Sequence, residues 1–245
     1  MDVHKLDHLS YEQLKTMGKT LGIPIPKNKA QLISDITDSM KNYELYKKNH
    51  IDCYTKIKQL GKKGKEGTTF LVQKDNDKYA MKTFRPTKSV STLNREAELQ
   101  KRATLEGISP PVIDVNLVEK YIVMEKLDHH LIDVISKNNN ELSILYQKKI
   151  IDIYNKLDSL GIFHGDANLL NYMVKGRKLY IIDYGMAREI TPALVSKLGT
   201  TTPNLNIMTL GFILKLRSMG LGRSSYEYLL TQLSHRQLEK FDLLS

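Results

Sequence analysis

Residues 162–185 of the chain read IFHGDANLLNYMVKGRKLYIIDYG. Asp166 stands two positions after His164, Asn171 follows five residues later, and Asp183 opens the triplet Asp-Tyr-Gly. Transfer of a terminal phosphoryl group requires a carboxylate that orients and deprotonates the accepting hydroxyl, and oxygen ligands that hold Mg²⁺. The spacing therefore predicts that Asp166 performs the first task and that Asn171 and Asp183 perform the second.

A lysine and a glutamate upstream fit the same chemistry. Lys82 lies in a stretch (78–84) that alternates like a strand, and it matches the Val-Ala-Ile-Lys pattern whose lysine contacts the α- and β-phosphates. Such a lysine needs a carboxylate partner, and Glu96 on a predicted helix is the first choice. Glu98, on another face of that helix, is the alternative, and a solvated glutamate is the simplest interpretation of either. These elements disfavour the view that His164 is only a packed core residue.

A glycine-rich segment precedes the lysine. Residues 61–68 read GKKGKEGT, between two apolar stretches that favour strands. Glycines let a backbone approach phosphate oxygens and turn its amide groups toward them. Gly64 and Gly67 keep the second spacing of the Gly-x-Gly-x-x-Gly pattern, whereas the gap after Gly61 is one residue too long. A plain hairpin turn is the alternative for this segment.

Together these elements, which span residues 54–217, resemble the catalytic core of the protein-kinase superfamily. The segments REAEL (95–99), GISPPVID (107–114) and LDSLGIFHGD (157–166) are similar to the compact kinase of the KEOPS complex and, more loosely, to the RIO kinases, which are small atypical serine/threonine kinases. The resemblance implies an α+β, bilobal protein-kinase-like fold with a reduced C-terminal lobe. It also implies an enzyme that uses ATP and Mg²⁺ to phosphorylate a protein substrate.

The resemblance also assigns site residues. Segment YIVMEKL (121–127) would be the strand and hinge that contact adenine, with Met124 as gatekeeper. The implied set is catalytic Asp166, Lys82 and Glu96, metal-binding Asn171 and Asp183, and nucleotide-binding Gly61, Gly64, Gly67, Lys82, Met124, Glu125 and Leu127.

Two departures from the superfamily pattern matter. Gly165 stands where regulated kinases carry an arginine that reads a phosphorylated activation loop, so activity independent of such phosphorylation is expected. Asn206 replaces the aspartate of the helix that underpins the catalytic loop. The few residues after this helix leave no room for a full substrate-docking lobe.

The first fifty residues form a separate predicted module. Ser10 and Gln13 make a capping box, and Leu14, Met17 and Leu21 form the buried stripe of a helix. A linker with two prolines follows, and Asn28 caps a second helix. The pattern resembles a SAP motif, which implies binding of double-stranded DNA through residues 1–50. A hairpin that packs on the kinase or docks a protein is the alternative.

Composition sets the outer limits. A length of 245 residues suits a moderate domain with a small one, which we place at residues 1–50 (SAP-like module), 51–127 (kinase N-lobe and hinge) and 128–245 (reduced C-lobe). The single cysteine excludes an intramolecular disulfide and favours a reducing compartment. No apolar run reaches the length of a membrane span, so no membrane partner is expected. The expected location is intracellular, in cytoplasm or nucleus, or in the virion if the source is a virus. The formal net charge of +10 favours acidic partners.

Two other functions compete with protein phosphorylation. An ATPase, or a binding protein gated by nucleotide, would use the same residues. A small-molecule phosphotransferase is the other alternative, because aminoglycoside and choline kinases share the His-Gly-Asp motif. Asp183-Tyr184-Gly185 and the short C-terminal region disfavour the latter.

Overall fold

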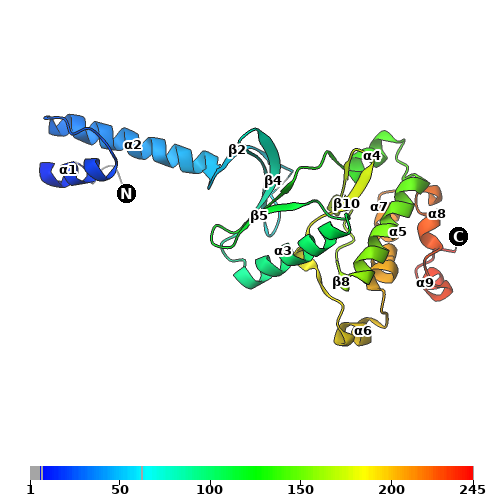
Figure 1. The fold of residues 1–245 in the computed structure, drawn as a ribbon. Coiled ribbons are helices and arrows are strands. Elements are labelled where there is room, and N and C mark those ends of the chain that lie inside the picture. Colours follow the sequence, from blue (N-terminus) through cyan, green and yellow to red (C-terminus); the bar gives the residue numbers. More distant parts are fainter. Residues whose placement is uncertain (1–5, 7, 62, 245) are drawn as a thin grey trace. The chain divides into compact units, whose positions relative to one another are not determined.

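A computed structural model describes residues 6, 8–61 and 63–244, with the backbone alone at residues 20 and 42–50. Helices and strands are mixed along the chain, which confirms the predicted α+β, kinase-like fold (Figure 1). The chain forms two compact units, Met1–Ile57 with Val72–Asn76, and Lys58–Leu71 with Asp77–Ser245. The boundaries that we placed after residues 50 and 127 stay predictions.

The first unit holds a pair of helices, α1 (Tyr11–Thr20) and α2 (Lys29–Asn49). Ser10 and Gln13 form the predicted capping box, and Asn28 accepts a hydrogen bond from the Ala30 backbone N–H at 2.9 Å. The two helices share a core of Leu6, Leu14, Leu32 and Ile36. The prediction for Leu21 was wrong, because α1 ends just before it and its side chain is 40% exposed.

A six-stranded sheet has the order β1-β2-β3-β4-β6-β5. Its strands are β1 (His50–Ile51), β2 (Tyr54–Leu60), β3 (Gly67–Lys74), β4 (Asp77–Phe84), β5 (Val112–Asn116) and β6 (Tyr121–Glu125). Strand β6 is paired on both sides, and its residues Tyr121–Met124 are all buried, as expected for an uninterrupted apolar run inside a sheet. Helix α3 (Val90–Leu105) contributes Leu93 and Ala97 to the core beside β6.

The remainder of the second unit is mostly helical. Helix α5 (Ile144–Ser159) carries Ile150, Ile153, Tyr154 and Leu157 into the largest core. Short strands around it are β7 (His129–His130), β8 (Ile162–Phe163), β9 (Tyr172–Lys175), β10 (Lys178–Ile181) and β11 (Arg188–Glu189). The other helices are α4 (Leu131–Lys137), α6 (Pro192–Leu198), α7 (Thr209–Ser218), α8 (Glu227–Leu230) and α9 (His235–Lys240). Among the described residues, no helix combines the length and apolar character needed to cross a bilayer.

Gly67 is required by the close approach of β3 to β4. A Cβ atom at this position would lie 1.9 Å from the Thr83 carbonyl oxygen, so the backbone itself would have to move. We expect Gly67→Ala to lower the free energy of unfolding by about 3 kcal/mol, the upper range for overpacking. Gly64→Ala is the matched control, since its Cβ would meet only the Gly67 carbonyl oxygen at 3.4 Å. Urea unfolding of the two variants measures this free energy. Equal losses of stability in Gly67→Ala and Gly64→Ala would contradict the prediction.

Candidate active site

Lys82 is the centre of the site. It lies on β4, and its Nζ is 2.6 Å from Glu96 Oε1 on α3 and 2.7 Å from Asp183 Oδ1. Glu96 is 2% exposed, because Leu93, Glu96, Ala97 and Gln100 share the buried face of the helix. Glu98, the alternative partner, instead pairs with Lys101 on the exposed face at 2.8 Å. The structure therefore brings together three residues that lie 14 and 87 positions apart along the chain.

The ammonium of Lys82 and the carboxylates of Glu96 and Asp183 stabilise one another in their charged forms. Burial alone would lower the pKa of Lys82, but the carboxylates of Glu96 and Asp183 outweigh it and raise that pKa. Burial alone would raise the pKa of Asp183, but the Lys82 ammonium outweighs it and lowers that pKa. Both side chains consequently remain charged across the physiological pH range.

Lys88 is a second lysine at the site, which the sequence analysis missed. Its Nζ lies 2.8 Å from Glu96 Oε2 and 2.7 Å from Glu66 Oε2. Its side chain is only 7% exposed and its ammonium lies over the Phe84 ring. Each oxygen of Glu96 is thus held by a different lysine, and Lys88 ties the glycine-rich segment to α3. Its signal in the sequence is weak, since it stands in the connection after β4 and matches no motif.

We expect Lys88→Met to destabilise the protein by about 1–3 kcal/mol, because it leaves a buried carboxylate with one partner in place of two. It should also lower kcat/KM for ATP roughly tenfold through a less well-fixed Glu96. Urea unfolding and initial rates over a series of ATP concentrations measure both effects. Lys101→Met removes an exposed ion pair from the same helix and should cost less than about 1 kcal/mol. Equal effects of the two substitutions would contradict a special role for Lys88.

Asp166 and Asn171 lie together in the catalytic loop. The Asn171 side-chain amide donates to Asp166 Oδ2 at 2.9 Å, and the Asn168 backbone N–H donates to Asp166 Oδ1 at 3.1 Å. Because its nitrogen faces Asp166, the carbonyl oxygen of Asn171 is the atom suited to a metal ion. Asp183 is 45% exposed and has a second carboxylate oxygen beyond the one held by Lys82. This donor set of hard oxygens fits Mg²⁺.

The backbone of Ile182 joins the two halves of the site. Its N–H donates to the Asn171 carbonyl oxygen at 2.8 Å, and its carbonyl oxygen is 3.1 Å from His164 Nε2. Burial lowers the pKa of His164, so its ring is neutral and packs edge-on against Tyr184. Asp183 follows with a φ of 67°, in the left-handed region. His164 therefore serves the geometry of the loop, which places Asp166, Asn171 and Asp183 around one connection.

Asn204 underpins the catalytic loop, in the place that we had predicted for Asn206. Asn204 is fully buried, and its Oδ1 accepts from the His164 backbone N–H at 3.0 Å. Its Nδ2 donates to the Ile162 carbonyl oxygen at 2.7 Å and to Asp158 Oδ1 at 2.6 Å. Asn206 instead donates to oxygens of Thr200 and Thr202. The prediction was wrong because a turn of π-helix, Asn204–Met208, shifts the phase of the residues before α7.

The glycine-rich segment closes on itself. The Gly64 N–H donates to the Gly67 carbonyl oxygen at 2.9 Å, and the Glu66 carbonyl oxygen accepts from the Arg85 N–H at 2.9 Å. Gly61 has a φ of 67° at the start of the turn. A Cβ atom on Gly185 would lie 2.5 Å from Glu66 Oε2, so the Glu66 carboxylate rests on the Asp-Tyr-Gly triplet. The turn therefore lies next to Asp183, with Gly67 committed to packing on β4.

The predicted hinge residues Met124 and Glu125 are the last two of β6, and Leu127 follows the strand. Met124 is 9% exposed in the core beside Ala80 and Leu93. The backbone N–H of Glu125 donates to the Pro111 carbonyl oxygen at 2.9 Å, so this donor is already used within the protein. Its carboxylate pairs with Lys175 at 2.6 Å. Leu127 is buried, and its carbonyl oxygen lies 3.4 Å from Lys126 Nζ.

Comparison with known proteins places this geometry in context. The family described as "RIO domain" matches residues 41–193. The chain is 28% identical over 158 residues to a candidate serine/threonine-protein kinase of Acanthamoeba polyphaga mimivirus, covering 60% of this chain and 29% of that protein. It is 32% identical over 95 residues to KEOPS complex subunit Bud32 of Pyrococcus abyssi, covering 38% and 43% of the two chains. It is 24% identical over 127 residues to a probable serine/threonine-protein kinase of Bacillus subtilis, covering 46% and 49%. The chain thus spans less than half the length of each of these curated relatives.

Proposed function

Because the chain belongs to the RIO domain family, whose pattern spans more than half of its residues, we propose that it transfers the terminal phosphoryl group of ATP to a serine or threonine hydroxyl of a protein. One observation carries the proposal. Lys82 contacts both Glu96 and Asp183, while Ile182, the residue before Asp183, is hydrogen-bonded to the loop that holds Asp166. Phosphoryl transfer depends chiefly on such positioning and on electrostatic stabilisation.

Each residue has a role in this proposal. Lys82, fixed by Glu96, binds the α- and β-phosphates, and Asp166 accepts the proton of the attacking hydroxyl. Asn171 and Asp183 hold Mg²⁺, which neutralises charge on the phosphates when it is bound with ATP. Met124, Glu125 and Leu127 surround the adenine, and the turn of Gly61, Gly64 and Gly67 covers the phosphates.

The test follows the label of γ-³²P-ATP. The purified chain is incubated with Mg²⁺ and with acidic and basic model proteins, and the label is sought on protein, on small molecules and as free phosphate. Acid-stable label on serine or threonine of a protein is the expected result. Label on amino-sugars or choline alone would contradict the proposal in favour of a small-molecule phosphotransferase.

An ATPase is the second candidate. One relative is named as a KEOPS complex subunit, and another, 34% identical over 95 residues, as a probable bifunctional tRNA threonylcarbamoyladenosine biosynthesis protein of Methanobrevibacter smithii, covering 38% of this chain and 16% of that protein. The first name describes a subunit of an assembly and neither name specifies phosphorylation of a protein, so ATP hydrolysis without a protein acceptor is the alternative that we propose. In the label experiment, free phosphate without labelled protein supports this candidate.

We further propose that activity does not depend on phosphorylation of the segment after Asp183. Arg188 and Glu189 of β11 pair with β8, and Glu189 lies 2.5 Å from Arg102, so carboxylate and backbone contacts order this segment. Phosphatase-treated protein should therefore keep its initial rate within about twofold, since no phosphate is needed to order the loop. A large loss of rate that rephosphorylation restores would refute this.

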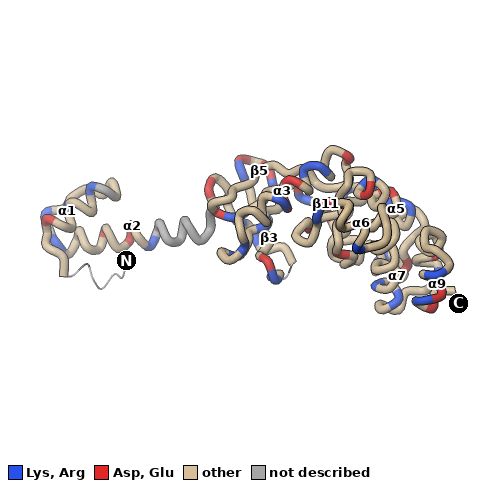
Figure 2. Tube along the Cα trace, turned by 90° about the horizontal axis from the view of Figure 1, so that it is seen from below, with Lys and Arg blue, Asp and Glu red and all other residues tan. Residues whose placement is uncertain are grey.

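A finer proposal is that residues 1–50 bind double-stranded DNA. Lys19, Lys27 and Lys29 are exposed on the α1–α2 pair, and Lys15 is bonded to Glu12 at 2.7 Å. Figure 2 shows basic and acidic residues interspersed along the chain, so the net charge is not concentrated in this module. Lys19→Glu with Lys27→Glu should weaken duplex binding and reduce its salt dependence. Binding that is unchanged across a salt series would remove this role.

A further inference from the structure

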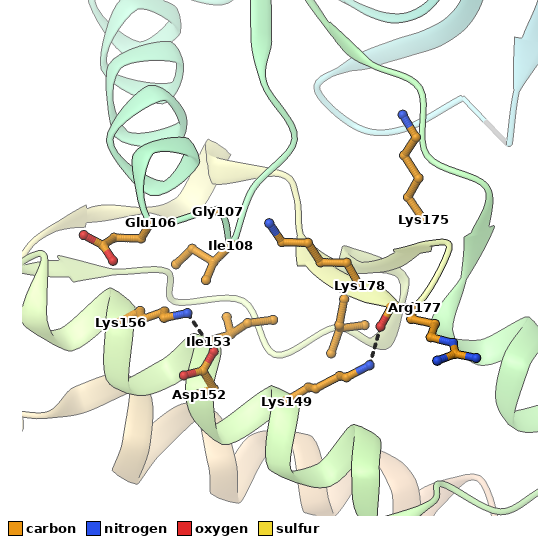
Figure 3. Close-up of a pocket in the computed structure, with 11 residues that line it drawn as sticks. Glu106, Gly107, Ile108, Lys149, Asp152, Ile153, Lys156, Lys175, Arg177 and Lys178 are labelled. Carbon is orange, nitrogen blue, oxygen red and sulfur yellow. Dashed lines mark hydrogen bonds and ion pairs between the residues drawn. The ribbon is translucent and has the colours of Figure 1, made fainter.

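A second basic site lies in a cavity of about 480 Å³ that none of the proposed catalytic residues lines. Its walls come from the residues that follow α3, from α5, and from the β9–β10 hairpin (Figure 3). Ile108, Ile153 and Leu179 are buried at its base. A volume of this size suits a small organic molecule.

Cationic side chains dominate the rim. Five basic residues and two acidic residues line the cavity: Lys149, Lys156, Lys175, Arg177 and Lys178, with Glu106 and Asp152. Two of the cations have carboxylate partners, since Lys156 pairs with Asp152 at 2.9 Å and Lys175 pairs with Glu125 at 2.6 Å.

The other three cations have no carboxylate partner within the described part of the chain. Lys149 Nζ donates to the backbone carbonyl oxygen of Arg177, which is neutral. Lys178 Nζ lies over the Tyr180 ring, 5.2 Å from its centroid, and would be 2.7 Å from a Cβ atom on Gly107. Figure 3 shows Lys149 and Lys178 on opposite sides of the hollow, and Arg177 at its edge with its guanidinium directed away from Lys178. Three uncompensated positive charges around one concave space repel one another, and an anion would relieve that repulsion.

We propose that this cavity binds the phosphate groups of a ligand that carries two or three negative charges. The charge of such a ligand matches the three uncompensated cations. An arginine fork with two lysine ammonium groups is a common means of holding phosphate oxygens. The missing side chain at Gly107 leaves room for the Lys178 ammonium beside the backbone, where it faces the cavity.

The test uses the whole 245-residue chain, labelled with ¹⁵N-glycine and titrated with inorganic pyrophosphate. Gly107 and Gly176 report on the cavity, whereas Gly64, Gly67 and Gly185 report on the proposed nucleotide site. Saturating an ATP analogue first fills the nucleotide site. The expected result is a further, saturable shift of the Gly107 and Gly176 amide signals. Absence of such a shift overturns the proposal.

Charge reversal localises the binding. Arg177→Glu with Lys178→Glu should raise the dissociation constant by roughly tenfold or more, the loss expected for one charge-assisted hydrogen bond. Arg236→Glu with Lys240→Glu makes the same change of charge on exposed residues of α9 and should leave the constant within about twofold. Equal losses in both variants overturn the proposal. Lys178→Gln is the milder variant, should the double reversal disturb the glycine spectrum as a whole.

A third arm separates two sources of phosphate. A fluorescein-labelled 12-nucleotide single strand is titrated beside pyrophosphate. The proposal is supported by each ligand whose binding Lys178→Gln weakens. Tighter binding of the oligonucleotide identifies a phosphate backbone as the source, and equal binding identifies a small phosphate-bearing molecule.

Discussion

Asp166→Ala should lower the rate of phosphoryl transfer by about 10²–10⁴-fold, the usual contribution of a positioned general base. The affinity for ATP should stay within about twofold, because Asp166 contacts Asn168 and Asn171 and not Lys82. Initial rates with labelled ATP measure the first quantity. Titration with a fluorescent ATP analogue measures the second. The loss should therefore appear almost entirely in kcat.

The matched control is Asp152→Ala, which removes an exposed aspartate of α5 that pairs with Lys156 at 2.9 Å. Its rate should equal that of the unaltered protein. A transfer rate that survives Asp166→Ala would show that another group takes the proton. An equal loss of ATP affinity would instead mean that Asp166 is a ligand of the bound nucleotide.

The central ion pair could be read from the sequence because its parts follow a local rule. Lys82 follows the buried Met81 on a strand, and Glu96 stands three positions after Leu93 and one before Ala97 on a helix. These spacings place Glu96 on the buried face, which also explains why Glu98 faces solvent. The catalytic loop and the Asp-Tyr-Gly triplet are likewise short motifs, and the chemistry that their spacing predicts stays a prediction.

Lys88 and Asn204 could not be predicted in this way. Lys88 meets Glu66 across 22 residues of chain, so the contact depends on the path of two connections. Asn204 meets His164 across 40 residues, and a turn of π-helix, which periodicity does not reveal, decides that it and not Asn206 faces the loop. The structure was needed wherever a contact joins two irregular segments.

Asn204→Ala should destabilise the protein at least as strongly as Gly67→Ala. It would leave the buried His164 N–H and the Ile162 carbonyl oxygen without their partner, and each such group costs about 1–3 kcal/mol. We therefore expect a loss of about 3–5 kcal/mol in the free energy of unfolding. Urea unfolding followed by circular dichroism measures it.

Catalysis should fall with stability in this variant, because the freed loop carries Asp166 two residues after His164. In buffer without urea, at a temperature where the variant is still folded, we expect kcat to fall by about tenfold or more through misplacement of the base. Asn206→Ala is the control, since its amide bonds Thr200 and Thr202 and not the loop of Asp166 among the described residues. This variant should leave kcat nearly unchanged. If Asn206→Ala impaired kcat more than Asn204→Ala did, the support for the loop would come from the segment around Thr200 and not from the π-helical turn.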